Sequence, residues 1–340
     1  MVAFVIDQYY LVITLLITIG WQCLGFFIAW TLQFDKITDF TGGSNFFVLA
    51  LVTLLMGNTF YARNIVASVF QMVWAARLAG FLLFRVLKTG SDNRFDDIRS
   101  HFLKFAGFWV GQILWVWVVS LPVVILNSPA VSDYSRGGDN PSFGTGRDIA
   151  GIILWALGFI VESWADIAKF WHKSNNPPKN RPCTAQVWGW SRHPPYFGEI
   201  ILQWGIWILT ISPSTNGRVD GGAKSAQYGA VVGPIFTTLL LLFASGIPTA
   251  EKPTAKKFYL QSYSPNPDRE NDGGSTWRHY KGYLDRTSLL IPIPPALYKP
   301  LPRWVKTWVL LDLPMYQFDE KKDGEKAIEE ERQKLERERS

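Results

Sequence analysis

Polar residues that could do chemistry lie close together in two otherwise apolar parts of the sequence. In the first, IVESWADIAKFWHK, Glu162 and Asp166 stand four residues apart and Lys169 follows three residues later. On a helix this spacing places all three on one face. Such a face forms either a ladder of acid–lysine pairs or the polar wall of a cofactor site, and both interpretations stay open.

The second part is GWSRHPPYFGEI, where Arg192 and His193 directly precede a Pro-Pro pair. The prolines disfavour helix just upstream and suit the first turn of a new helix, on which Tyr196 and Glu199 follow. Free N–H groups at a helix start and a guanidinium both favour anions, so this arrangement predicts a phosphate site. The alternatives are an interfacial anchor for Arg192 and a structural hydrogen bond for His193.

A third set of polar residues lies in the N-terminal half. Trp74, Arg77 and Arg85 fall near one face of a predicted helix. Arg85 can extend to the membrane surface, but Arg77 lies about two turns deeper, which predicts a buried, paired and functional arginine. Asp35 and Asp39, in FDKITDFTGG, are interpreted either as caps of the next helix or as catalytic acids.

Several other classes of site are not supported by the pattern. The four histidines, at positions 101, 172, 193 and 279, have no metal-like spacing, so we expect no metal. Cys23 and Cys183 cannot build a disulfide framework. The chain contains no GxGxxG or P-loop motif, and no basic stripe that would suit nucleic acid.

The composition indicates the class of fold that must position these residues. Hydrophobic residues make up 48% and charged residues only 18%, and the charges concentrate after residue 250. Seven apolar stretches approach the ~17–25 residues that a helix needs to cross a bilayer. We therefore expect an all-α polytopic membrane protein with a polar C-terminal tail. The predicted spans lie near Tyr9–Leu32, Ser44–Tyr61, Ile65–Leu87, Phe105–Asn127, Ile149–Ala168, Tyr196–Ile211 and Ala226–Ile247.

Loop charges predict the orientation. The loops Lys88–Lys104 and Lys169–Pro195 are basic, so both are expected to face the cytosol. With seven spans, the C-terminal tail is then cytosolic and the N-terminus is luminal. We expect a multi-pass protein of the endoplasmic reticulum membrane.

Segments distributed along most of the chain resemble the uncharacterised branch of the steroid 5-alpha-reductase C-terminal superfamily, in its fungal or plant style. They extend to about Pro302. Together with FDKITDFTGG, these segments are RLAGFLLFRVLKTGSDNRFDDIR, FLKFAGFWVGQILWVWVVSLPVVILN, WADIAKFWHK, VWGWSRHPPYFGEI and YLDRTSLLIPIPP.

The resemblance implies a bundle of about seven helices whose C-terminal half binds NADPH. It implies that hydride reduces a carbon–carbon double bond in a lipid such as a sterol, steroid or terpenoid. Residues 1–127 would form the substrate side, 128–302 the cofactor-binding domain and 303–340 a charged tail. The predicted cofactor residues are Glu162, Asp166, Lys169, Arg192, His193, Tyr196, Glu199, Tyr259, Tyr283 and Arg286.

The chain departs from the family pattern at two places. Pro195 stands where members often have Asn, and Trp74 occupies the position of a Tyr that acts with a Glu in better-known relatives. No Glu precedes Glu162, so either the acceptor differs from that of the relatives, or Asp39 and Arg77, beside Trp74, take over the catalytic role. Two alternatives stay open: a methyltransferase using S-adenosylmethionine, suggested by the similar SRHPPYFGE segment, and a non-catalytic protein that binds membrane lipid or a sterol-like molecule.

Overall fold

The structure is a computed structural model, which describes residues 6–32, 37–89, 100–266 and 272–339. Within these ranges the chain is helical, and strand-like pairing is confined to an isolated bridge between Ser191 and Ser288. Asp35 and the RFDDIR segment, which entered the sequence interpretation, lie outside the described residues.

Six helical segments of the described chain are long and apolar enough to cross a membrane. Five contain a single long helix each: α1 (Leu11–Thr31), α2 (Thr38–Gly57), α3 (Ala62–Thr89), α4 (Phe102–Asn127) and α6 (Gly146–Ser174). The sixth, Gly221–Tyr263, contains α9 (Gly221–Gly229), α10 (Val232–Leu239), the π-helical turn η5 (Leu240–Ala244) and α11 (Ile247–Tyr263). The prediction of an all-helical polytopic membrane protein is confirmed.

The remaining predicted span, near Tyr196–Ile211, is also a helix. It is α7 (Pro194–Thr210), which has 17 residues and is the shortest of the helices predicted to cross. Pro194 occupies its first position, where the missing N–H of proline costs no helical hydrogen bond.

The chain divides into two compact units, and the divisions fall inside α6, α7 and α10. The first unit comprises residues 1–157 and 201–237, and the second comprises 158–200 and 238–340. Each unit is described by itself.

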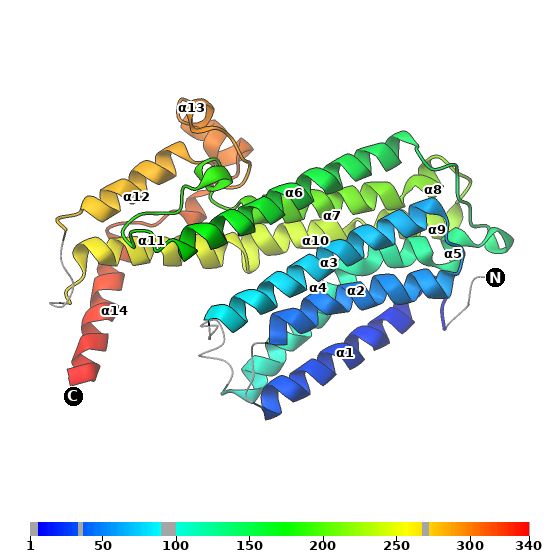
Figure 1. Cartoon of the computed structure of the whole chain (residues 1–340), viewed down its shortest axis with the longest axis horizontal. Helices are drawn as coiled ribbons and strands as arrows, with labels where there is room; N and C mark the ends of the chain where they lie inside the picture. The colour runs from blue at the N-terminus through cyan, green and yellow to red at the C-terminus, as the bar shows by residue number, and fades with distance from the viewer. Residues whose placement is uncertain (1–5, 33–36, 90–99, 267–271, 340) are drawn as a thin grey trace. The chain divides into compact units, whose positions relative to one another are not determined.

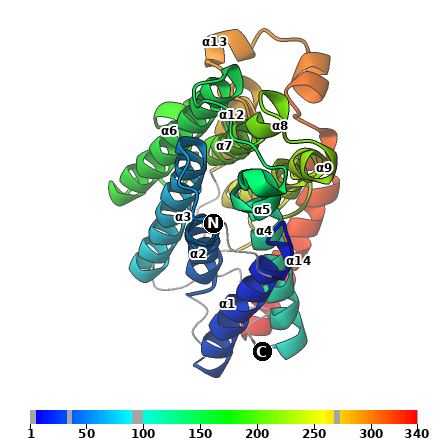
Figure 2. The ribbon, with the colours of Figure 1, turned by 90° about the vertical axis from the view of Figure 1, so that its right-hand side faces the viewer.

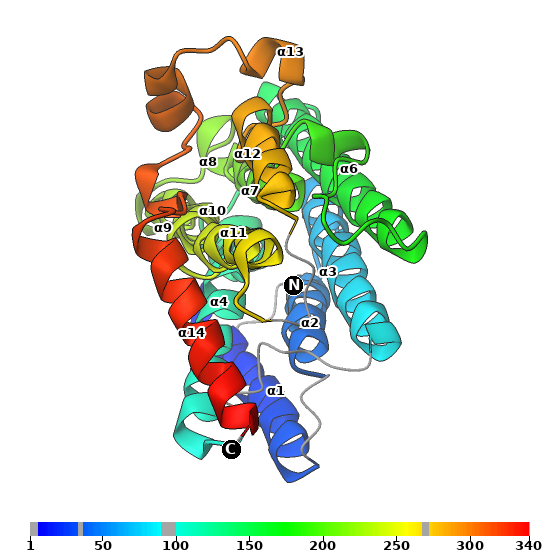
Figure 3. The same cartoon turned by 90° about the vertical axis from the view of Figure 1, so that its left-hand side faces the viewer.

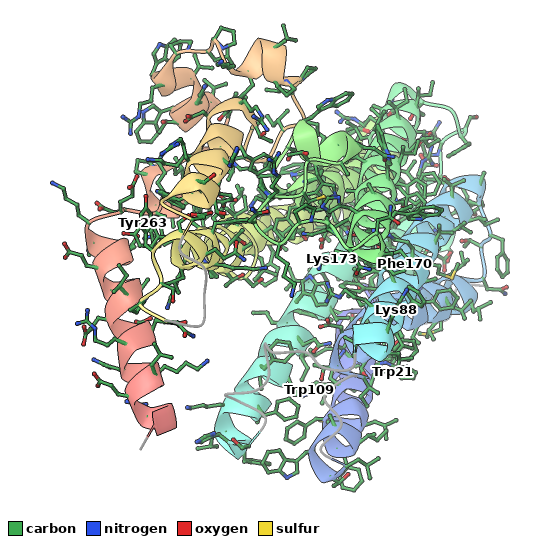
Figure 4. The ribbon with its side chains drawn as sticks, turned by 60° about the vertical axis from the view of Figure 1, so that its left-hand side comes forward. Trp21, Lys88, Trp109, Phe170, Lys173 and Tyr263 are labelled. Carbon is green, nitrogen blue, oxygen red and sulfur yellow. The ribbon has the colours of Figure 1, made fainter. Side chains whose placement is uncertain are left out.

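In the first unit, α1 to α4 pack as a bundle in which α2 contacts α1, α3 and α4 (Figure 1). Aromatic rings join α1 to α4: Phe26 lies 5.7 Å from Phe105 and 6.1 Å from Trp109, between ring centroids. Figure 4 labels Trp109 where side chains of these two helices meet. Other apolar side chains of α1 are exposed, including Leu16 (52%) and Phe27 (65%), which suits contact with lipid.

One end of the first unit carries its short helices. Figure 2 shows α5 (Pro129–Ser132), α8 (Ser212–Thr215) and α9 gathered there. Nearby loop residues are held by Arg63, which is fully buried and binds Asp148 through two hydrogen bonds of 2.8 Å. The same guanidinium donates to Asn140 and to the Pro141 carbonyl, so this buried ion pair has a structural role in fixing the loop before α6.

The second unit is built on α11, which contacts α12 (Ser275–Arg286) and the C-terminal helix α14 (Lys322–Arg339) (Figure 3). One cluster of its apolar core comprises Leu242, Ile247, Leu289, Leu290 and Tyr316. The Tyr316 hydroxyl donates to the Leu242 carbonyl at 2.7 Å, which ties the C-terminal segment to the π-helical turn before α11.

Candidate functional site

A buried ion cluster lies in the second unit, where α7 begins. Arg192 donates through Nη1 to Glu251 Oε2 at 2.5 Å, and its Nη2 lies 2.7 Å from Asp312 Oδ2. His193 Nε2 lies 2.7 Å from Glu251 Oε1. Arg192, His193 and Glu251 are only 6%, 8% and 7% exposed. Buried charges are costly unless they are paired. The unit must therefore fold so that these charged side chains stay in contact.

Backbone pairing explains how Arg192 and His193 reach this position. Arg192 N donates to the Ser288 carbonyl at 2.8 Å, and His193 N donates to the Leu289 carbonyl at 3.1 Å. The Ser191 hydroxyl adds a bond of 2.7 Å to the Leu290 carbonyl. The segment before α7 is therefore held in extended form by the segment after α12, as expected for residues preceding proline.

Glu251 and Asp312 come from other elements. Glu251 lies in the second turn of α11, and Asp312 follows the π-helical turn η6 (Val305–Val309). The Tyr298 hydroxyl donates to Asp312 Oδ2 at 3.2 Å, and burial together with the Asp312 carboxylate raises the pKa of Tyr298. Tyr298 therefore remains a neutral donor.

The protonation states follow from burial and pairing. Burial opposes the charge of Arg192, but Glu251 and Asp312 outweigh it and hold the pKa of Arg192 above its ordinary value. Burial lowers the pKa of His193, against the opposing effect of Glu251. The cluster places two carboxylates, those of Glu251 and Asp312, against one guanidinium, that of Arg192.

This charge balance bears on the predicted phosphate site. Arg192 is already engaged by two carboxylates, so a phosphate at this position would have to displace one of them. The cluster is instead suited to a positive charge placed beside it.

The adjoining Tyr196 ring stacks on His193, with centroids 5.2 Å apart and planes 3° apart.

A second group of predicted residues gathers on α6 and around Trp188. Glu162 is buried, and a Cβ built on Gly198 of α7 would lie 2.8 Å from the Glu162 Cβ, so the two helices approach closely here. Lys169 Nζ lies 4.0 Å from the Trp188 ring centroid. The Tyr283 hydroxyl donates to the Trp188 carbonyl at 3.1 Å, and burial raises the pKa of Tyr283.

Four other predicted cofactor residues belong to this unit. Asp166 and Glu199 are half-buried on α6 and α7. Tyr259 packs against Trp277 in a different aromatic cluster, with ring centroids 5.3 Å apart. Arg286 is exposed at the last position of α12. The structure thus brings together Arg192, His193 and Tyr196, and it places Tyr259 and Arg286 elsewhere in the unit.

The three residues predicted to act on substrate belong to the first unit. Asp39 Oδ2 lies 3.9 Å from Arg85 Nη2. Trp74 is fully buried, with its ring centroid 5.0 Å from that of Phe46. The Arg77 guanidinium lies 5.8 Å from the Phe81 ring centroid on the same helix.

Sequence reasoning missed Glu251 and Asp312. A signal was present for both: Glu251 is the first charged residue after the uncharged run from Ala226 to Ala250, and Asp312 stands alone in VLLDLPMY. Among the described residues, no group of three or more His, Cys, Asp or Glu side chains is arranged to hold a metal ion.

Comparison with protein families gives a match over most of the chain. The family described as "Protein of unknown function (DUF1295)" matches residues 25–265. The chain belongs to the DUF1295 family. The matched range includes Arg192, His193 and Glu251 but ends before Asp312, so the family region supplies most of the ion cluster. No curated protein and no solved structure matches the chain.

Proposed function

We propose that this DUF1295 protein is an NADPH-dependent membrane reductase that transfers hydride to a carbon–carbon double bond of a lipidic substrate. The resemblance to the steroid 5-alpha-reductase C-terminal superfamily suggests this chemistry. The single observation that carries it is the buried ion cluster at the start of α7, which places two carboxylates against one guanidinium and includes Arg192 and His193, two of the residues that the resemblance assigns to the cofactor.

The sign of this charge fits the reaction. When bound, NADPH supplies the hydride, and its nicotinamide ring becomes positively charged as the hydride leaves. Glu251 and Asp312, held in place by Arg192, would stabilise that developing positive charge more than they stabilise the neutral ring. An interaction that strengthens toward the transition state accelerates the chemical step.

The roles of the other residues follow from their contacts. Arg192 acts as a positioning residue that holds two carboxylates, and His193 fixes the second oxygen of Glu251. The cofactor phosphates would then need other cations of this unit, such as Lys169, whose Nζ lies over Trp188. The substrate would reach the site from the membrane, where the apolar faces of the helices are exposed to lipid.

Methyl transfer from S-adenosylmethionine is the second candidate, because a negative cluster also suits a sulfonium cation. In that reaction the positive charge disappears as the methyl group leaves. The cluster would therefore stabilise the reactant rather than the transition state, which favours tight binding and opposes the chemical step. This difference in sign is our reason for preferring hydride transfer.

The test is a side-by-side titration of NADPH, NADP+ and S-adenosylmethionine against the purified full-length protein in detergent. We expect Glu251→Gln to weaken NADP+ binding by about tenfold more than NADPH binding, the equivalent of ~1.4 kcal/mol. Glu320→Gln, which removes an exposed acid of the same unit, is the matched control and should change neither affinity.

The outcomes separate the candidate functions. Binding of S-adenosylmethionine without either nicotinamide cofactor would refute the reductase proposal in favour of methyl transfer. If a folded sample binds none of the three, the protein is better explained as a lipid-binding membrane protein. Equal effects of Glu251→Gln on both nicotinamide forms would refute the electrostatic role given to the cluster.

A further inference from the structure

A cleft of about 900 Å³ opens in the second unit, apart from the ion cluster. It lies between α11, α12, α14 and the loop that follows α6. The lining residues on which the argument depends are Lys179, Lys256, Lys257, Gln261, Thr276 and Glu331. Neither the ion cluster nor the proposed reduction uses any of them.

The charged lining of the cleft comprises three lysines and two acids, Asp272 and Glu331. Lys256 and Lys257 come from α11, and Lys179 comes from a loop distant in sequence. Asp272, an acid of the lining, is engaged by α12: its carboxylate accepts hydrogen bonds from Thr276 N at 2.8 Å and from Gly274 N at 3.1 Å. Three lysines converging on one open cleft favour an anionic ligand.

Gln261 indicates a second chemical group that the ligand should carry, namely a hydrogen-bond donor. Its Oε1 atom is buried and has no hydrogen-bond partner among the described residues. A buried carbonyl oxygen without a donor is costly, so a hydroxyl or amine that reached it would gain a hydrogen bond. A phosphate carried on a polyol offers both the anion and the donor.

Acidic residues of α14 already lie at the lysines of this cleft. Lys256 forms an ion pair with Glu330, and Glu331 lines the cleft. Two further pairs hold α14 and the residues before it to the unit: Lys252 with Asp323 at 3.2 Å, and Lys281 with Glu320 at 2.8 Å. Each is solvent-exposed, and exposed pairs contribute little energy, so an incoming anion can replace them.

We propose that this cleft binds the phosphate group of a phosphorylated polyol, and that Glu330 and Glu331 of α14 compete with this ligand for the lysines. Lys179, Lys256 and Lys257 bind the phosphate, and Gln261 accepts a hydrogen bond from a hydroxyl of the ligand. The same chemistry is present in a soluble nucleotide and in a phosphoinositide headgroup at the membrane surface. The proposal is independent of the proposed reductase function.

The experiment uses the full-length protein in detergent with ADP as the soluble probe. A parallel arm uses phosphatidylcholine vesicles with and without phosphatidylinositol 4-phosphate. We expect at least one probe to bind and Lys256→Gln/Lys257→Gln to weaken that binding by about tenfold or more, because charge-assisted hydrogen bonds are lost. Glu330→Gln/Glu331→Gln should strengthen it several-fold, a gain that misfolding cannot produce.

Two controls make the result specific. Lys252→Gln removes a lysine of the same helix that also pairs with the C-terminal segment but does not line the cleft, so it should leave binding within about twofold of wild type. Glu251→Gln, in the ion cluster, should also leave ADP binding unchanged, because Glu251 does not line the cleft. Binding of ADP alone, or of the phosphoinositide vesicle alone, identifies the source of the phosphate.

Failure of both probes to bind the wild-type protein would overturn the proposal. It would also be overturned if Lys252→Gln weakened binding as much as the cleft variants do, because the effect would then come from docking of α14.

Discussion

Arg192 illustrates, at the scale of single residues, how a buried charge ties distant segments together. It lies between Glu251 and Asp312 and is 6% exposed. We expect Arg192→Ala to lower the free energy of unfolding by ~3–5 kcal/mol, because it leaves the buried carboxylate of Glu251 and the half-buried one of Asp312 without their cation. Denaturant unfolding of the purified protein in detergent measures this change.

A double-mutant cycle checks the cause of that loss. Adding Glu251→Gln to Arg192→Ala removes one of the two uncompensated charges, so the double variant should be less destabilised than the sum of the single variants. Arg136→Ala is the exposed control, since Arg136 pairs with Asp133 at 3.6 Å while 43% exposed, and it should cost about 1 kcal/mol at most. Additive losses at positions 192 and 251 would contradict the pairing.

His193 makes the stability of the protein depend on pH. Burial lowers the pKa of His193 below its ordinary value of 6.5, so the unfolded chain takes up a proton before the folded one does. The stabilisation from neutral His193 is therefore fully present above about pH 6.5 and is lost as the pH falls below it. We expect the free energy of unfolding to decrease with acidification in this range, and His193→Gln to flatten that dependence. A variant whose unfolding keeps the full slope would place the titrating group elsewhere.

At the scale of secondary-structure elements, the apolar pattern predicted the helices well. The expected span Tyr9–Leu32 is α1 (Leu11–Thr31), and Phe105–Asn127 is α4 (Phe102–Asn127). A membrane-spanning helix satisfies its own backbone, so the length of an apolar run largely determines it. The boundary of α6 was less predictable: it continues to Ser174, beyond the expected Ala168, because its last turns are amphipathic rather than apolar.

The ion cluster could be predicted only in part, because its contacts join residues that are distant in sequence. Arg192 and His193 stand out locally because they precede Pro194, but their partners are 58 or more residues away along the chain. Which acid pairs with Arg192 depends on how α11 and the segment after α13 (Pro295–Tyr298) fold back. No spacing rule within one helix encodes such a contact.

Close packing between α6 and α7 yields a prediction at the same scale. Within the first unit, a Cβ on Gly205 would lie 2.7 Å from Trp155 N and 2.8 Å from the Gly151 carbonyl oxygen. Both contacts are with backbone atoms, which cannot move aside without separating the helices. We expect Gly205→Ala to destabilise the protein by ~1–3 kcal/mol, as measured by denaturant unfolding.

The matched control for this prediction is Gly111→Ala in α4. A Cβ at Gly111 meets nothing within 4 Å, and alanine is the better helix former by roughly 0.5–1 kcal/mol. The control should therefore be neutral or stabilising. If both substitutions had the same effect, helix propensity rather than the close approach of the two helices would explain it.

At the scale of the whole molecule, the number of membrane crossings depends on α7. Six helical segments are long enough to cross by themselves, whereas α7 has 17 residues, at the lower limit of what spans the hydrocarbon core. If α7 crosses, the basic loop before it and the Gly- and Ser-containing loop after it lie on opposite sides of the membrane. The positive-inside rule then places the loop containing Lys179, together with the C-terminal tail, in the cytosol.

Single cysteines placed in these loops test this topology. In a background in which Cys23 and Cys183 are replaced by Ser, we expect Lys179→Cys and Lys334→Cys to react with a membrane-impermeant maleimide from the cytosolic side. Arg218→Cys, in the exposed loop after α7, should react only after the membrane is permeabilised, because one helix separates it from position 179. Reaction of positions 179 and 218 from the same side would mean that α7 does not cross, and the N- and C-termini would then share one side of the membrane.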